Sequence, residues 1–297
     1  MTGPPASGMP GLKVAADIGG TFTDIVFQWG DGTLDKRKVQ TTPDDYAQAI
    51  VDGVAAFLAQ KHLSGPAVQE ILHATTVATN AILERRGARS ALITTEGFRD
   101  VLELRRIRIP YSYDPSWSKP EPMIEREWRF EVRERVAADG SVLTAFDAAS
   151  LEPALARIRD AGIESVAVCL LHAYANAAHE QAIASILRAR LPGVSLSLSH
   201  RVLPEVREYE RTSTTVVNAY VAPLMARYLA TLRARFAAID THAPILVMQS
   251  AGGLISAGAA ASHAVTVIES GPAAGVVAAA QVARAAGYDN LITLDMG

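Results

Sequence analysis

The fold is decided by the stretch Asp17-Ile18-Gly19-Gly20-Thr21-Phe22-Thr23-Asp24. Two apolar runs flank it, Val14-Ala15-Ala16 and Asp24-Ile25-Val26-Phe27-Gln28-Trp29, and they predict a β-hairpin with Gly19 and Gly20 in its turn. Glycine lets the backbone approach a ligand without a Cβ clash, and converging backbone N–H groups bind phosphate. The stretch therefore indicates a phosphate-binding hairpin.

The candidate phosphate contacts of the hairpin are Gly19, Gly20, Thr21, Phe22 and Thr23. Both threonines would add hydroxyl donors. Asp17, at the end of the first strand, is placed to hold a metal ion, because Mg²⁺ usually takes one or two carboxylates plus substrate phosphates. A tight turn without a ligand is the alternative, which the flanking Asp and Thr-x-Thr-Asp disfavour. The sequence contains neither a Walker A loop nor a Gly-x-Gly-x-x-Gly dinucleotide loop.

Composition predicts a globular chain with a large apolar core. The 297 residues are 49% hydrophobic and carry a formal net charge of −3, so we expect no nucleic acid and no membrane as partner. The single Cys169 lies in an apolar run and is expected to be a buried structural thiol. No apolar stretch reaches the ~18 residues that span a bilayer. Residues 1–11 resemble a loose tail rather than a signal peptide, and we expect a cytoplasmic protein.

Strand and helix patterns alternate along the chain, which predicts an α/β fold. In the first part we expect a strand at 35–41 and then a helix with Thr42 as its N-cap, Pro43 as its first residue and an apolar face to residue 57. Buried strands are expected at 70–73 and 90–95, on either side of a helix at 78–83.

The middle part interrupts this rhythm. Residues 98–122 combine the basic run Arg105-Arg106-Ile107-Arg108 with prolines and aromatic residues, which indicates a long ordered arm rather than a solvated linker. An inserted α/β subdomain is then predicted from a strand at 128–132, a helix at 148–161, a strand at 166–171 and a helix at 177–190.

The last part is predicted to hold a long helix over 213–236, kinked or broken at Pro223, and strands at 245–248, 265–268 and 291–294. We therefore divide the chain into a flexible tail (1–11), a first lobe with the phosphate hairpin (12–98), an inserted arm and α/β subdomain (99–204), and a segment with the long helix, a hinge and the start of a second lobe (205–297).

The hairpin motif resembles the first phosphate motif of the actin-like ATPase (ribonuclease H-like) fold. In that fold a helix of small residues precedes a second Asp-x-Gly loop, and Glu269–Gly275 with the following helix and Asp295-Met296-Gly297 resemble this pair. The resemblance implies ATP and Mg²⁺ as cofactors, with Asp17 and Asp295 facing each other as catalytic and metal-binding residues. It also implies nucleotide contacts at Gly271, Gly275 and Gly297.

Longer motifs narrow the resemblance to one family. They are His73–Glu84, Ile93–Glu103, Leu171–Tyr174, Glu208–Thr215 and Gln249–Gly253. Together they closely resemble the N-terminal portion of the hydantoinase A, 5-oxoprolinase and acetone (or acetophenone) carboxylase family. The resemblance implies that ATP phosphorylates a carbonyl-derived oxygen, in a lactam or hydantoin amide or a ketone enolate, and activates it for hydrolysis or carboxylation. It also implies a small carbonyl substrate and a hetero-oligomer with a hydantoinase B-type or carboxylase partner subunit.

His73 is a further catalytic candidate. With the pair Thr75-Thr76 it could polarise the substrate or donate to phosphate, and a hydrogen-bonded cap at the strand end is the equal alternative.

The other polar motifs have structural alternatives. For Arg105, Arg106 and Arg108 an ion-paired surface strand is favoured over an anion site. For His172, His179 and Glu180 packing and capping are favoured over a metal site. For Glu208, Glu210 and Arg211 ion pairs and substrate contacts are both open.

Two other functions stay open: a truncated, non-catalytic structural subunit of such a complex, and a sugar kinase of the same fold. In the actin-like fold the adenine pocket follows the second Asp-x-Gly, so we expect residues 1–297 to hold half of a nucleotide site. The shared motifs do not separate hydrolase from carboxylase.

Overall fold

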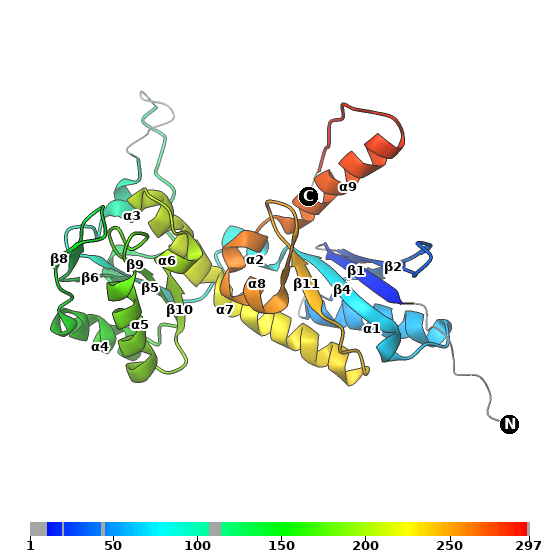
Figure 1. Cartoon of the computed structure of the whole chain (residues 1–297), viewed down its shortest axis with the longest axis horizontal. Helices are drawn as coiled ribbons and strands as arrows, with labels where there is room; N and C mark the ends of the chain where they lie inside the picture. Colours follow the sequence, from blue (N-terminus) through cyan, green and yellow to red (C-terminus); the bar gives the residue numbers. More distant parts are fainter. Residues whose placement is uncertain (1–10, 20, 43–44, 107–113, 296–297) are drawn as a thin grey trace. The chain divides into compact units, whose positions relative to one another are not determined.

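The structure is a computed structural model, and it describes residues 11–19, 21–42, 45–106 and 114–295. The chain divides into two compact units, one formed by residues 1–86 with 224–297 and the other by residues 87–223. Each unit has its own β-sheet with helices packed on it (Figure 1).

The sheet of the first unit has six strands in the order β12-β11-β4-β1-β2-β3. The strands β1 (Leu12–Ile18), β2 (Phe22–Gln28) and β3 (Leu34–Gln40) form an antiparallel meander. On the other side of β1, β4 (Val68–Thr75) and then β11 (Ile245–Met248) add in parallel, and β12 (Leu254–Ser256) closes the edge. The parallel crossovers bring residues far apart in sequence to the end of β1.

Two helices from well-separated parts of the sequence pack against this sheet. Helix α1 (Tyr46–Gln60) buries an apolar face that includes Phe57, whose ring stacks on Phe27 of β2 with centroids 3.6 Å apart. The second half of α7 (Glu208–Ala238) runs beside α1 (Figure 1), and Arg235 bonds Asp45 and Gln48. The other helices of this unit are α2 (Val77–Leu83), η1 (Gly65–Ala67), α8 (Ala257–Ser262), η4 (Ala264–Val267) and α9 (Ser270–Ala285).

The second unit contains a four-stranded parallel sheet in the order β10-β9-β5-β6. Its central strands β5 (Ser90–Thr95) and β9 (Ser165–Cys169) are buried at every position, as expected for a parallel sheet covered on both faces. Alternate residues point to opposite faces, so Ile93 and Val168 meet one apolar cluster and Leu92 and Cys169 meet another.

The first cluster is formed with α4 (Glu152–Asp160) and α5 (Ala178–Arg190), and the second with the first half of α7 and with α3 (Val101–Leu104). The remaining elements are β6 (Arg129–Val132), β7 (Arg135–Val136), β8 (Val142–Thr144), β10 (Ser195–Leu198), η2 (Arg126–Trp128), η3 (Ala148–Leu151) and α6 (Ser199–Val202).

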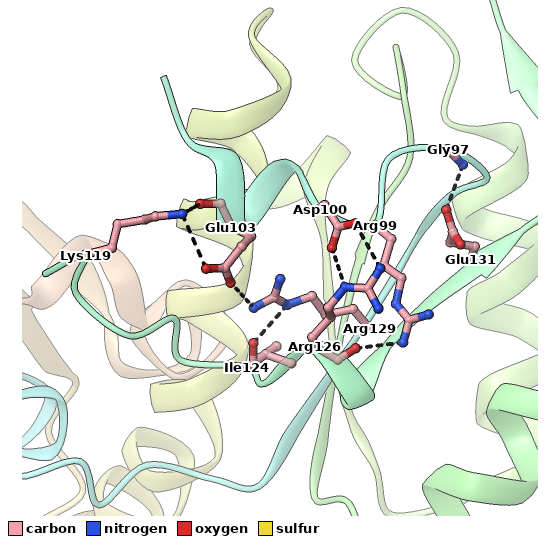
Figure 2. A network of polar contacts seen from close by, with 9 residues as sticks. All are labelled: Gly97, Arg99, Asp100, Glu103, Lys119, Ile124, Arg126, Arg129 and Glu131. Atoms are coloured by element: carbon pink, nitrogen blue, oxygen red, sulfur yellow. Dashed lines mark hydrogen bonds and ion pairs between the residues drawn. The ribbon is translucent and has the colours of Figure 1, made fainter. Parts of the chain in front are cut away.

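A polar network joins the two ends of the predicted arm, whose residues 107–113 lie outside the described part of the chain (Figure 2). The buried Arg129 donates Nε–H to the Ile124 carbonyl at 3.0 Å and Nη2–H to the Glu103 carboxylate at 3.1 Å. Lys119 reaches the Glu103 carbonyl oxygen, and Arg126 holds Asp100 through two nitrogens at 2.8 and 3.0 Å. The network therefore fixes the base of the arm.

Three expectations about local structure are wrong. Residues 265–268 are mostly in η4 rather than a strand, because Thr266 N–H bonds the His263 carbonyl three residues back. Residues 291–295 have no strand partner among the described residues. Arg105 does not lie on a strand: it ends α3 with a positive φ of 56°.

The helix predicted at 213–236 is longer than expected. Helix α7 begins at Glu208 and continues through Pro223 to Ala238. Buried side chains on both sides of the proline, such as Val221 and Met225, hold the two halves against their cores and offset the missing N–H. The alternative of a helix broken at Pro223 is therefore wrong.

Candidate functional site

The turn of the β1–β2 hairpin is closed by backbone bonds and supported by Thr41. Gly19 N–H donates to the Phe22 carbonyl at 3.0 Å, and a Cβ at position 19 would lie 3.0 Å from that oxygen, so glycine fits and a larger residue is crowded. Thr41 donates its hydroxyl to the Gly19 carbonyl at 2.9 Å and its N–H to the Thr21 carbonyl at 2.9 Å. Thr41, the residue directly after β3, thus fixes the backbone of the turn.

The hairpin residues predicted to contact phosphate are not equivalent in the structure. Thr21 and Phe22 are exposed at the turn. Thr23 is fully buried and shares a hydrogen bond with the Thr41 hydroxyl at 3.0 Å, so its side chain supports the turn. Gly20 lies outside the described residues.

Asp17 lies at the end of β1, opposite Asp24 of β2 in the strand register. Partial burial raises the pKa of its carboxyl, and the carboxylates of Asp24 and Asp295 raise it further. Asp24 is exposed and pairs with Lys38 at 3.3 Å, so its carboxylate already has a cationic partner.

The N-terminus of α9 is fixed beside Asp17. The Ser270 hydroxyl bonds both the N–H and the carbonyl of Thr75 at the end of β4, at 3.3 and 3.2 Å. Glu269, just before the helix, has a left-handed φ of 59° and donates its N–H to the Thr79 hydroxyl at 2.9 Å. A Cβ at Gly271 would lie 3.6 Å from Asp17 Oδ1, which is an ordinary van der Waals distance, so the first turn of α9 lies next to the carboxylate.

The other glycines predicted to contact nucleotide differ from Gly271. A Cβ at Gly275 would meet nothing within 4 Å, so this position faces open space. Gly297 lies outside the described residues.

His73 is buried in β4 and uses both ring nitrogens. Nδ1 lies 3.1 Å from the Ala16 carbonyl, and Nε2 lies 2.6 Å from the Tyr228 hydroxyl. Burial lowers the pKa of His73 to about 4, so the ring is neutral at neutral pH. The ring therefore has no free nitrogen for a substrate in this structure.

The histidines and glutamate of the second unit have structural roles. His172 bonds the Val136 carbonyl at 2.8 Å, and His179 bonds Glu134 at 2.7 Å. Glu180 accepts bonds from Leu170 N–H, the Ser199 hydroxyl, and His200 N–H and Nδ1. These contacts are of the kind that packing and capping predict. Among the described residues, no cluster of three or more potential metal ligands occurs.

The charged residues at the start of α7 also form internal contacts. Arg106 pairs with Glu210 and lies 3.6 Å from Glu208. Arg211 is buried, bonds the Leu170 and Glu205 carbonyls, and lies over the Tyr174 ring. Arg108 lies outside the described residues. Cys169 is buried beside Thr212, and burial raises the pKa of its thiol, as expected for a structural cysteine.

Sequence reasoning missed three residues that organise the site: Thr41, Thr79 and Tyr228. Each acts on a partner far away in the sequence, so no local motif identified it. A threonine directly after the third strand of the meander is the one local signal that could have pointed to Thr41.

Comparison with solved structures defines the class of fold. The chain superposes on the caprolactamase of Pseudomonas jessenii with a TM-score of 0.83 at 34% identity, over 96% of this chain and 42% of that one. It superposes on acetone carboxylase in a nucleotide-free structure with a TM-score of 0.84 at 24% identity, over 95% of this chain and 42% of that one. Both neighbours have the actin-like ATPase fold, so the predicted fold class is confirmed.

Comparison with family models and relatives defines the family. The model of the hydantoinase/oxoprolinase N-terminal region matches residues 13–191, and the hydantoinase/oxoprolinase model matches residues 211–297. The chain belongs to the hydantoinase/oxoprolinase family, as the sequence motifs predicted.

Two relatives illustrate the range of the family. The caprolactamase subunit alpha of Pseudomonas jessenii is 35% identical over 96% of this chain. The acetophenone carboxylase gamma subunit of Aromatoleum aromaticum is 32% identical, also over 96%. The chain spans 42% and 41% of the lengths of these two proteins. Among the described residues, no helix has the length and apolarity required to cross a bilayer.

Proposed function

We propose that this chain carries the first half of an ATP site in an enzyme that phosphorylates a carbonyl-derived oxygen and so activates a small carbonyl substrate. The observation that carries the proposal is the approach of Gly271, in the first turn of α9, to the Asp17 carboxylate at the end of β1. This geometry combines a glycine hairpin, a carboxylate and a helix N-terminus at one place.

Each of these parts has a role that follows from its chemistry. The exposed Thr21 at the turn offers a hydroxyl to phosphate. The first turn of α9 presents the positive end of a helix dipole, which favours phosphate groups. Asp17 and Asp295 would be the carboxylates that hold Mg²⁺, because Mg²⁺ usually takes one or two carboxylates together with substrate phosphates.

Bound ATP would supply the phosphoryl group that converts a poor leaving oxygen into a good one. Phosphoryl transfer requires mainly positioning and charge neutralisation. The names of the relatives support an ATP-dependent reaction: a solved neighbour is described as an ATP-dependent caprolactamase. Since a caprolactamase subunit and an acetophenone carboxylase subunit match this chain at 35% and 32% identity, the proposal covers hydrolysis of a cyclic amide and carboxylation of a ketone.

A partner subunit is part of the proposal. Two relatives are named as subunits, an alpha and a gamma subunit. We expect a hetero-oligomer with a hydantoinase B-type or carboxylase partner, in which this chain supplies the ATP-dependent half-reaction.

The test is calorimetric titration of the full-length protein, with its partner subunit, with Mg-ATP. Asp17→Asn is expected to weaken Mg²⁺-dependent ATP binding by about tenfold or more, or ~1.4 kcal/mol. Asp52→Asn, which changes an exposed aspartate on α1, is the matched control. Unchanged binding in Asp17→Asn would contradict the site assignment. Absence of binding in the wild-type complex would favour the structural-subunit alternative.

A second measurement distinguishes cyclic-amide hydrolysis from ketone carboxylation. Purified complex is incubated with a lactam, a hydantoin or oxoproline, and separately with a ketone plus bicarbonate, and substrate-dependent ADP release is followed. ADP release with a hexose alone would instead support the sugar-kinase alternative.

A further inference from the structure

The buried His73 and the partly buried Tyr228 form a pair beside the end of β1. The Tyr228 hydroxyl lies 2.6 Å from His73 Nε2, and the two rings are 5.6 Å apart at a tilt of 43°. The two residues are 155 positions apart, one on α7 and the other on β4. His73 is only 2% exposed.

The partners of His73 define a single arrangement of protons. A carbonyl oxygen only accepts, so the nitrogen 3.1 Å from the Ala16 carbonyl, Nδ1, carries the hydrogen. In a neutral ring Nε2 is then an acceptor, and Tyr228 must donate to it. Burial lowers the pKa of His73 and raises the pKa of Tyr228 above its ordinary value, so both groups are neutral.

The pair acts on the residue next to Asp17. Ala16 and His73 are opposite each other in the parallel register of β1 and β4. The His73 side chain therefore bonds the carbonyl of the peptide that links Ala16 to Asp17. That peptide sets the direction in which β1 presents the Asp17 carboxylate to Gly271.

We infer that Tyr228 and His73 are positioning residues of the candidate ATP site: the Tyr228 hydroxyl orients the His73 ring, and His73 Nδ1–H holds the Ala16 carbonyl that precedes Asp17. The inference rests on the proposed function of the hairpin. It assigns a supporting role to His73. Direct contact with a substrate would need a free ring nitrogen, and both ring nitrogens are already bonded, one to the Ala16 carbonyl and the other to the Tyr228 hydroxyl.

The first experiment observes the proton arrangement without any nucleotide. In the full-length protein labelled with ¹⁵N-histidine, the NMR spectrum is expected to show His73 protonated at Nδ1 alone, with no titration across the neutral range. Tyr228→Phe is expected to move the Nε2 resonance and leave Nδ1 protonated. A proton on Nε2, or titration near neutral pH, would overturn the inference whatever the chain does with ATP.

The second experiment measures the effect on the site. Tyr228→Phe removes only the hydroxyl, and is expected to raise the KM for Mg-ATP roughly three- to tenfold, the effect of one net hydrogen bond, with a smaller change in kcat. Tyr220→Phe, the same substitution on the same helix in a residue whose ring packs beside Gly87, is the control. No ATP turnover by the wild type would refute the proposed function, and the NMR result would still decide the proton arrangement.

A double-mutant cycle then separates positioning from catalysis. His73→Asn keeps an N–H near the position of Nδ1 and loses the acceptor for Tyr228. If Tyr228 acts through His73, Tyr228→Phe should have no further effect on KM in the His73→Asn background. Additive effects, or a thousandfold loss of kcat at unchanged KM in His73→Asn, would overturn the inference.

Discussion

Ser270 Oγ accepts a hydrogen bond from the Thr75 N–H at 3.3 Å and lies 3.2 Å from the Thr75 carbonyl, to which it donates. The two residues are 195 positions apart and both are fully buried. One hydroxyl thus attaches the start of α9 to the end of β4, beside the strand that carries Asp17. The position of Gly271 next to Asp17 depends on this attachment.

Ser270→Ala is expected to lower the free energy of unfolding by about 1–3 kcal/mol, because it leaves two buried backbone groups without their partner. Urea denaturation measures the change as a lower midpoint. Ser185→Ala, which removes an exposed hydroxyl bonded within α5, is the control. A midpoint equal to that of the wild type would show that the bond contributes nothing to stability.

Gly271→Val is expected to weaken Mg-ATP binding by about tenfold or more, or ~1.4 kcal/mol. Its Cβ would lie 3.6 Å from Asp17 Oδ1, and its methyl groups would occupy the space beside the carboxylate. Gly258→Val on α8 is the matched control, since a Cβ there meets nothing within 4 Å. Calorimetry on the full-length complex gives both affinities, and equal affinities would argue against a ligand at this position.

Asp17→Asn is expected to raise the Tm of the nucleotide-free protein at neutral pH, although it weakens Mg-ATP binding. The pKa of Asp17 is higher in the folded chain than in the unfolded chain. The protonated carboxyl therefore stabilises the folded chain at pH values below the unfolded-state pKa. This contribution is lost as the pH rises through the folded-state pKa. The ionised carboxylate therefore destabilises the folded chain at neutral pH.

Thermal unfolding across a pH series checks this prediction. The difference in Tm between wild type and Asp17→Asn should shrink as the pH falls through the acidic range. Mg²⁺ should raise the Tm of the wild type more than that of the variant. A variant less stable than the wild type at neutral pH would show that the ionised Asp17 carboxylate stabilises the folded chain, contrary to this expectation.

Glu180→Ala is expected to destabilise the second unit by about 3 kcal/mol or more, because it leaves several buried donors without an acceptor. The carboxylate accepts from Leu170 N–H, the Ser199 hydroxyl and His200. Glu152→Ala, which breaks an exposed pair with Arg190, should cost less than about 1 kcal/mol. Urea denaturation measures the loss of unfolding free energy, and hydrogen exchange locates that loss in the second unit. Equal losses in Glu180→Ala and Glu152→Ala would refute a stabilising role for the Glu180 hydrogen bonds.

Local patterns predicted most of the elements and the family. The hairpin around Gly19, the buried strand at 166–171 and the helix at 177–190 were predictable because turn glycines and hydrophobic periodicity are properties of neighbouring residues. The apolar run at 265–268 shows the limit of this reasoning, since β-branched residues favour strands but need a free sheet edge. The predicted domain boundaries and nucleotide contacts stay predictions.

The sequence by itself determined the glycine hairpin, the α/β class and the membership of the hydantoinase/oxoprolinase family, because these depend on residue types at fixed short spacings. Only the tertiary structure decided which side chains support the site. Thr23 turns inward to Thr41, Ser270 joins Thr75, and Tyr228 fixes His73. Such pairs depend on strand register and on helices packed from distant parts of the chain, and no spacing along the sequence encodes them.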